Sequence, residues 1–314
     1  MEPSKRVVKA DFASRDPLAV LADVRRVTGR RYELVRRLPR GAWGAWEVVE
    51  ADRSHGDGRA VLKVIWDADW RARADLAVKV VEALRKRDLP VSAMLAIGHV
   101  PAAGTWLLTE YLMGSRVEQL TPALVADVIR FSDATSGLVP QLDRGFNWTD
   151  EVRRVLSPQS DELAELRASG RAEARVADAA ATHVAEADEL PRHDAVHGDF
   201  LVTQLLTDAS GSRLEGIVDW DAAAPGARAI DLALLFQNVE VQGDRTGKPA
   251  DATVFETIAN AGRRAGWPGF VAAVHYHLVK MVGFVAVHNR RHLAWRLDVA
   301  TRVQRKVLEF GGES

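Results

Sequence analysis

The residues with the strongest chemical pattern in this chain lie near position 200. Asp199 belongs to the tripeptide His197-Gly198-Asp199, Gln204 follows five residues after it, and Asp219 follows twenty residues after it. Carboxylate and amide oxygens are hard donors, and Mg²⁺ prefers such oxygens, whereas zinc more often takes nitrogen and sulfur ligands. The residue types therefore predict a magnesium site built from two aspartates and one glutamine.

These side chains meet only if the chain between them folds back on itself. Two short apolar segments, 204–207 and 214–218, have the composition of strands, and turn residues at 208–212 join them into a hairpin. Such a hairpin brings Asp199, before the first strand, and Asp219, after the second, to the same edge of a lobe. A lone aspartate beside a strand is most often a solvated turn residue or a helix cap, so the prediction depends on the joint pattern.

The joint pattern resembles the aminoglycoside phosphotransferase and choline kinase-like family, which shares the protein-kinase fold. In that family His-Gly-Asp is followed by an asparagine five residues later, a strand that ends in aspartate, and a Pro/Gly turn that leads to Asp-Leu-Ala. The matching segments here are 197–199 (HGD), Gln204, 218–221 (VDWD), 225–226 (PG) and 231–233 (DLA). Segments 60–65 (AVLKVI) and 107–114 (LLTEYLMG) resemble the family's lysine-bearing strand and the hinge between its lobes.

The resemblance implies a phosphotransferase that moves the γ-phosphate of ATP, or of GTP, to a hydroxyl of a small-molecule acceptor. That acceptor is expected to be an aminoglycoside-like or other cationic antibiotic or metabolite. By resemblance, Asp199 is the catalytic residue that orients the acceptor hydroxyl and takes its proton, and Asp219 holds Mg²⁺. Gln204 replaces the usual asparagine and offers its oxygen on one more methylene, which predicts weakened Mg²⁺ binding.

The resemblance also assigns residues that bind the nucleotide or support the loop. Lys63 is expected to contact the α- and β-phosphates, and the backbone from Glu110 to Leu112 is expected to contact the nucleotide base. His197 and Asp231 resemble residues that brace the catalytic loop, so both are expected to be structural supports.

Two features of the first half leave alternatives open. A phosphate-binding loop at 40–46 would use Gly41 and Gly44, but two glycines are equally typical of an ordinary hairpin. The acidic partner of Lys63 is either Asp75 or Glu82, and we favour Glu82. Gln204 and this uncertain pairing favour an alternative from another class, a pseudokinase that binds nucleotide without turnover. The presence of Lys63, Asp199 and Asp219 together favours catalysis.

The second half contains a group of histidines and acids that could line the acceptor site. His288 and His292 are four residues apart and are expected to share a helix face, as a packed or partly exposed pair rather than a metal site. The candidates are His275, His277, His288, Asn289 and His292, with Asp143, Asp150 and Glu151 as acids for a cationic acceptor.

The elements that position these residues change character near residue 113. Apolar segments rich in Val, Leu, Tyr and Trp predict strands at 32–35, 43–50, 60–66, 93–100 and 105–112, with a helix at 69–87. Beyond Met113-Gly114, helical patterns dominate at 121–137, 160–189 and 252–310. We expect an α+β, bilobal protein-kinase-like fold, with a small β-rich nucleotide-binding lobe over 1–112 and a larger, mostly helical lobe over 113–314 that carries the catalytic loop and the acceptor site.

Composition excludes several other classes of protein. The 42 Lys and Arg residues nearly balance the 43 Asp and Glu residues, which argues against an obligate nucleic-acid binder. No signal-peptide pattern and no apolar run of about 20 residues is present, so we expect a cytoplasmic protein without a membrane partner. Residues 1–112 contain 20 basic and 15 acidic residues, and the remainder 22 and 28, which suits phosphates on the first half and a cationic acceptor on the second. The sequence leaves the oligomeric state open.

Overall fold

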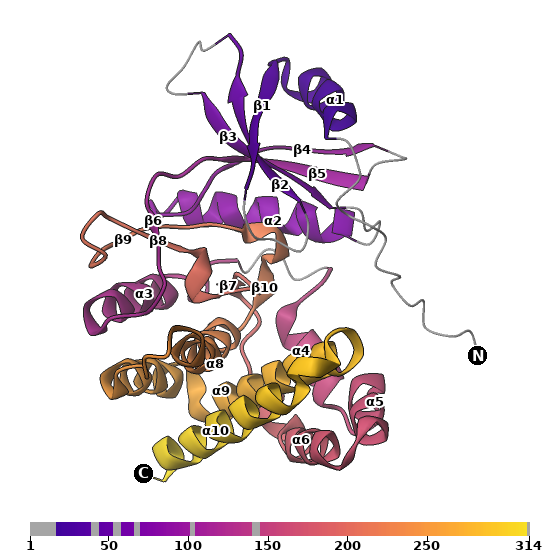
Figure 1. The fold of residues 1–314 in the computed structure, drawn as a ribbon, viewed down its shortest axis with the longest axis vertical. Helices are drawn as coiled ribbons and strands as arrows, with labels where there is room; N and C mark the ends of the chain where they lie inside the picture. Colours follow the sequence, from indigo (N-terminus) through magenta and orange to yellow (C-terminus); the bar gives the residue numbers. More distant parts are fainter. Residues whose placement is uncertain are drawn as a thin grey trace. The chain divides into compact units, whose positions relative to one another are not determined.

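The chain folds into two compact units, each with its own core. The first comprises the described residues up to Val78 together with Ser92–Leu112, and the second comprises Lys79–Val91 together with the chain from Met113 onward. A sheet dominates the first unit and helices dominate the second, which confirms the α+β class (Figure 1). This computed structural model describes residues 17–38, 44–52, 58–65, 70–100, 104–139 and 145–312.

The first unit is built on one antiparallel sheet of five strands in the order β1-β2-β3-β5-β4. The strand segments predicted from the sequence are confirmed to within about two residues at most ends, the usual uncertainty of such boundaries. The helix that precedes the sheet was not predicted. The elements are α1 (Leu18–Thr28), β1 (Tyr32–Arg37), β2 (Ala45–Glu50), β3 (Arg59–Ile65), α2 (Trp70–Arg85), β4 (Met94–Val100) and β5 (Gly104–Glu110). Helix α2 belongs to the first unit only up to Val78.

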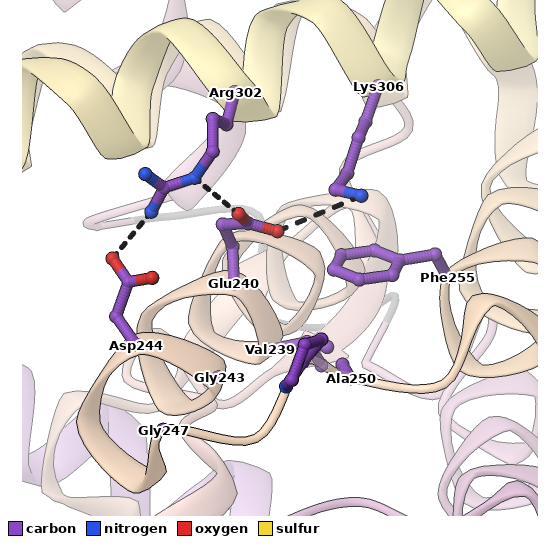
Figure 2. Close-up of a pocket in the computed structure, with 10 residues that line it drawn as sticks. Val239, Glu240, Gly243, Asp244, Gly247, Ala250, Phe255, Arg302 and Lys306 are labelled. Atoms are coloured by element: carbon purple, nitrogen blue, oxygen red, sulfur yellow. Dashed lines mark hydrogen bonds and ion pairs between the residues drawn. The ribbon is translucent and has the colours of Figure 1, made fainter.

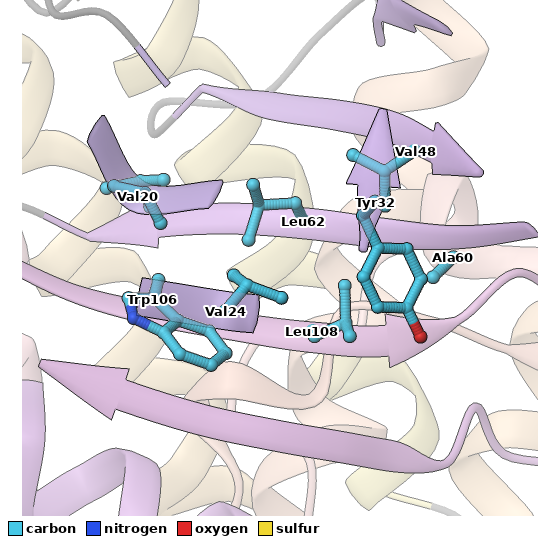
Figure 3. Close-up of a cluster of buried hydrophobic side chains, with 9 residues drawn as sticks. Val20, Val24, Tyr32, Val48, Ala60, Leu62, Trp106 and Leu108 are labelled. Carbon is cyan, nitrogen blue, oxygen red and sulfur yellow. The ribbon is translucent and has the colours of Figure 1, made fainter. Parts of the chain in front are cut away.

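The central strand β3 has two faces with different roles. Leu62 and its alternate neighbours on β3 are buried in a cluster with Val20 and Val24 of α1 and with Trp106 of β5 (Figure 3). Because side chains alternate across a strand, Lys63 lies on the opposite face of the sheet. The apolar cluster thus accounts for the face of β3 that lies opposite Lys63.

The second unit combines a helical core with two very small sheets. One sheet pairs β10 with β7, and the other has the strand order β6-β8-β9. Both sheets carry the loops around position 200. The elements are β6 (Ser115–Arg116), α3 (Pro122–Ala134), α4 (Trp148–Leu156), α5 (Asp161–Ser169), α6 (Arg171–Ala181), α7 (Val184–Ala187), β7 (Asp194–Val196), η1 (Val202–Gln204), β8 (Leu205–Thr207), β9 (Leu214–Ile217), η2 (Trp220–Ala222), β10 (Ala224–Gly226), α8 (Arg228–Thr246), α9 (Ala252–His288), η3 (Arg290–His292) and α10 (Leu293–Gly311).

Helix α9 is the core helix of this unit, and its composition differs from our expectation. It is long and apolar enough, by length and composition alone, to cross a membrane, whereas the sequence was expected to contain no such stretch. The expectation considered only uninterrupted apolar runs. In the structure 61% of its most apolar stretch is buried, because α8, α10, α3 and α6 pack around it. Burial within the protein accounts for the apolar composition of α9.

Candidate active site

The loop that carries Asp199 is held in place by the buried carboxylate of Asp231. We call residues 197–201 the HGD loop; it follows β7. Asp231, in the first turn of α8, accepts the backbone N–H of His197 at 2.7 Å and that of Gly198 at 2.9 Å. Burial raises the pKa of Asp231 to about 6, against the opposing effects of His197 and of these two N–H donors. Asp231 thus anchors the HGD loop to the helical core.

His197 connects the HGD loop to the segment that carries Asp219, residues 218–223, which we call the VDW segment. Its Nδ1 accepts the backbone N–H of Asp199 at 3.2 Å, which places the ring proton on Nε2. That nitrogen donates to the carbonyl oxygen of Val218 at 2.9 Å. The ring is fully buried and lies 4.5 Å, centroid to centroid, from the ring of Trp220. Because both ring nitrogens are occupied, the geometry supports a bracing role for His197.

Asp219 has an unusual backbone conformation. Its φ of 71° and ψ of 45° lie in the left-handed region, and Asp88 is the only other non-glycine residue with positive φ in the described part of the chain. Such a conformation costs of order 1–3 kcal/mol and persists only where the surroundings enforce it. Here the N–H of Val218 donates to the carbonyl of Gln204 at 3.0 Å, which fixes the preceding residue. Strain of this kind is concentrated at functional sites.

The side chains of Gln204 and Asp219 meet directly. Gln204 Nε2 donates to Asp219 Oδ2 at 3.0 Å, and both residues are half-buried, as is Asp199. No described residue donates a hydrogen bond to Gln204 Oε1, so the amide oxygen remains available. The described residues contain no group of three His, Cys, Asp or Glu side chains suited to a metal. Magnesium in phosphoryl-transfer sites usually takes only one or two carboxylates plus phosphate oxygens, so this donor pair fits Mg²⁺.

Two supports of the HGD loop and of the residue that follows it were not predicted from the sequence. Asn238, 9% exposed, accepts the backbone N–H of Val202 at 2.9 Å. It lies seven residues after Asp231 on α8, so two helical turns place both side chains on the face that meets the loop. That spacing was a usable signal. Trp148 of α4 packs on Gly198, and no local pattern indicated it.

The first unit contains the predicted phosphate-contacting residues. Lys63 is half-buried at the centre of β3 and is paired in register with Ala45 on one side and Leu107 on the other. Gly44 has a packing reason to lack a side chain, because a Cβ there would lie 2.5 Å from the ring of Trp46. Gly41 lies outside the described residues. A role for either glycine in phosphate binding stays a prediction.

The two acids considered as partners of Lys63 are exposed, and the segment expected to form the hinge is hydrogen-bonded to its neighbouring strand. Glu82 and Asp75 both have exposed side chains on α2, so the Lys63–Glu82 pairing also stays a prediction. The Glu110 carboxylate accepts the backbone N–H of Ala93 at 3.1 Å, which ties the end of β5 to the start of β4. The chain is irregular from Tyr111 to Gly114, and no described residue accepts the backbone N–H of Leu112.

Most of the candidate acceptor residues are occupied elsewhere in the structure. His275 and His277 are buried in α9, and burial lowers their pKa values to about 3 and about 4. His275 stacks on His183 at 4.3 Å, which lowers its pKa further, and His277 donates through Nε2 to the carbonyl of Ile230 at 2.9 Å. Both histidines are therefore core residues.

The remaining acceptor candidates lie in several different surroundings. Asp150 accepts a bidentate contact from Arg192, and Glu151 one from Arg154 at 2.8 and 2.9 Å. The expected shared helix face of His288 and His292 is wrong, because α9 ends at His288 and the turn η3 intervenes. Asn289 caps the end of α9, and Asp143 lies outside the described residues.

A cavity of about 450 Å³ lies elsewhere in the second unit, where α8, α9 and α10 meet (Figure 2). Arg302 forms ion pairs with Glu240 and Asp244, each at 2.5 Å, and Lys306 lies 3.9 Å from Glu240 and 4.3 Å from the centre of the Phe255 ring. None of the residues predicted to be functional lines this cavity. The charged side chains that line the cavity pair with one another, and these ion pairs join α10 to α8.

Comparisons with known proteins agree with this architecture. A model of the phosphotransferase enzyme family matches residues 20–270. A thermostable mutant of aminoglycoside phosphotransferase APH(4)-Ia, in ternary complex with ADP and hygromycin B, is 20% identical, with a TM-score of 0.63, over 94% of this chain and 99% of that one. Aminoglycoside phosphotransferase APH(3'')-Id from Streptomyces rimosus, in complex with ADP and streptomycin, is 20% identical, with a TM-score of 0.54, over 84% and 98%. No curated protein sequence matches this chain significantly.

Proposed function

Because this chain belongs to the phosphotransferase enzyme family, we propose that it transfers the γ-phosphoryl group of ATP to a hydroxyl of a small molecule. The observation that carries the proposal is the hydrogen-bonded assembly of the HGD loop and the VDW segment. His197 links the two segments. Gln204, which lies between Asp199 and Asp219 in the sequence, donates a hydrogen bond to Asp219.

Asp199 is proposed to accept the proton of the acceptor hydroxyl. Phosphoryl transfer depends mainly on positioning and on neutralising charge, so a fixed carboxylate beside the nucleophile is the main requirement on the protein. The Asp231 anchor holds the backbone directly before Asp199, and His197 holds the backbone N–H of Asp199 itself. A half-buried side chain on a fixed loop can orient a hydroxyl without rearrangement.

Asp219 and Gln204 are proposed to hold Mg²⁺ through Oδ1 or Oδ2 and through Oε1. When bound there, the ion would supply positive charge that offsets the negative charge of the phosphates. The hydrogen bond from Gln204 Nε2 orients the Asp219 carboxylate, and the left-handed backbone of Asp219 fixes where its side chain begins.

The residues 1–112 are proposed to bind the nucleotide, and 113–314 the acceptor. Lys63 is proposed to contact the α- and β-phosphates, and the backbone N–H of Leu112 to donate to the base. The basic excess of the first region and the acidic excess of the second support anionic and cationic ligands respectively. The structural relatives are complexes with ADP and with hygromycin B or streptomycin, which supports a hydroxyl-rich, cationic acceptor.

The test is an ADP-release screen with Mg-ATP over aminoglycosides, other hydroxylated antibiotics, amino alcohols and sugars, and with GTP in place of ATP. We expect turnover with at least one acceptor and its loss in Asp199→Asn. The matched control is Asp208→Asn, which makes the same substitution in the exposed turn of the neighbouring hairpin and should keep wild-type turnover. Nucleotide binding by thermal shift without turnover for any acceptor would favour the pseudokinase.

A further inference from the structure

Helix α4 begins against the chain that leads into the HGD loop. Its N-cap Asn147 donates through Nδ2 to the carbonyl of Arg192 at 3.1 Å. Thr149 donates through Oγ1 to the carbonyl of Pro191 at 2.6 Å. These contacts fix the first turn of α4, and with it the side chain of Trp148, which is only 8% exposed.

Trp148 contacts both segments that carry the candidate carboxylates. Its indole N–H donates at 3.0 Å to the carbonyl oxygen of Ala222, in the VDW segment three residues after Asp219. Its ring occupies the space that a Cβ on Gly198 would need, directly before Asp199. Gly198 also has a φ of 81°, so glycine is required there both by its backbone and by the ring.

The packing continues beyond the VDW segment. A Cβ on Gly226 would lie 2.7 Å from the Cβ of Trp148, so the strand β10 also approaches the tryptophan closely. Strand β10 pairs with β7, the strand that enters the HGD loop. A single side chain therefore touches the chain before Asp199 and the chain after Asp219.

We propose that Trp148 is a positioning residue for phosphoryl transfer, one that sets the spacing between the HGD loop and the VDW segment. This inference rests on the proposed function. Asp231 holds the HGD loop by hydrogen bonds to two backbone N–H groups, and Trp148 blocks displacement of Gly198 by contact. A misplacement of about 1 Å in a reacting group costs on the order of 10²-fold in rate, so loss of this contact reduces turnover more than binding.

The experiment compares Trp148→Phe with the matched variant Trp106→Phe, in the full-length protein. Trp106 makes the same two kinds of contact away from the HGD loop, because its indole N–H donates to Asp23 at 2.8 Å and its ring packs on Gly98. We expect Trp148→Phe to lower kcat per folded molecule at least tenfold, with KM for Mg-ATP and acceptor within threefold of wild type. Trp106→Phe should keep kcat within twofold.

Trp148→Tyr keeps an aromatic ring and a terminal donor, and should give a kcat between those of wild type and Trp148→Phe. If Trp148→Phe does not fold, Trp148→Tyr provides the test of the positioning role in its place. A wild-type kcat in the folded Trp148 variants, or an equal loss of kcat in Trp106→Phe, would overturn the positioning role. If the wild-type protein shows no transfer that depends on Asp199, the proposed function fails, and the positioning role fails with it.

Discussion

The clearest test of how the site is held together is Asp231→Asn. Relative to wild type, this variant should gain stability as pH rises towards 7 but should lose activity. Burial raises the pKa of the Asp231 carboxyl group from its usual value of 3.8 to about 6 in the folded protein. Between these values the folded state holds the proton more tightly, so wild-type stability falls as pH rises. At about 1.4 kcal/mol per pKa unit, the fall approaches about 3 kcal/mol.

Asparagine has no such proton to lose. Between pH 4 and pH 7 the free energy of unfolding of Asp231→Asn should therefore rise by up to about 3 kcal/mol relative to wild type. Turnover should show the reverse. The ionised carboxylate accepts both backbone N–H groups of the HGD loop, whereas the amide nitrogen is a donor and leaves one N–H unpaired. We expect kcat to fall by about 10²-fold.

Urea denaturation at pH 4, 5, 6 and 7, followed by circular dichroism, measures the first effect, and ADP release at pH 7 measures the second. Asp194→Asn is the matched control. Asp194 also accepts two backbone N–H groups, from Gly137 at 2.8 Å and Arg228 at 2.9 Å, but the Arg228 guanidinium lies 3.8 Å away. That variant should be destabilised at pH 7. A wild-type advantage over Asp231→Asn that grows from pH 4 to pH 7 would refute the reasoning.

Two further outcomes follow from the site and the core. Gln204→Met keeps the side-chain length but removes both polar atoms, so Mg-ATP affinity measured by calorimetry should fall at least tenfold. Gln204→Asn should keep or tighten that affinity. Equal affinity in the Met variant and wild type would exclude Gln204 as a ligand. His275 has its pKa lowered to about 3, so the folded protein holds it neutral and loses stability as pH falls below about 6.5, where the unfolded chain takes up a proton. His275→Phe, which keeps the stack on His183, should reduce this loss by up to about 1.4 kcal/mol per pH unit between pH 6 and 4 in urea denaturation, and an unchanged slope would contradict the assignment.

The sequence by itself determined the local parts of this protein. Composition predicted β2, β3 and β5 and, with them, the position of Lys63 on a strand, because runs of Val, Leu, Tyr and Trp between turn residues depend only on neighbouring residues. The hairpin between Gln204 and Asp219 was predicted for the same reason, since its turn residues lie between two short strands. The motif spacing also identified the family, which the match over residues 20–270 shows.

Contacts between distant segments were decided only by the tertiary structure. The family resemblance implied that Asp231 braces the loop, but not which groups it binds. Asp231 accepts the N–H of His197, 34 residues back, and Trp148 donates to the carbonyl of Ala222, 74 residues on, so neither contact has a local signature. The burial of His275 and the left-handed backbone of Asp219 likewise depend on what packs around them. Residue types and spacing name the groups that can do chemistry, but the hydrogen bonds and packing that hold those groups in place arise from the folded chain.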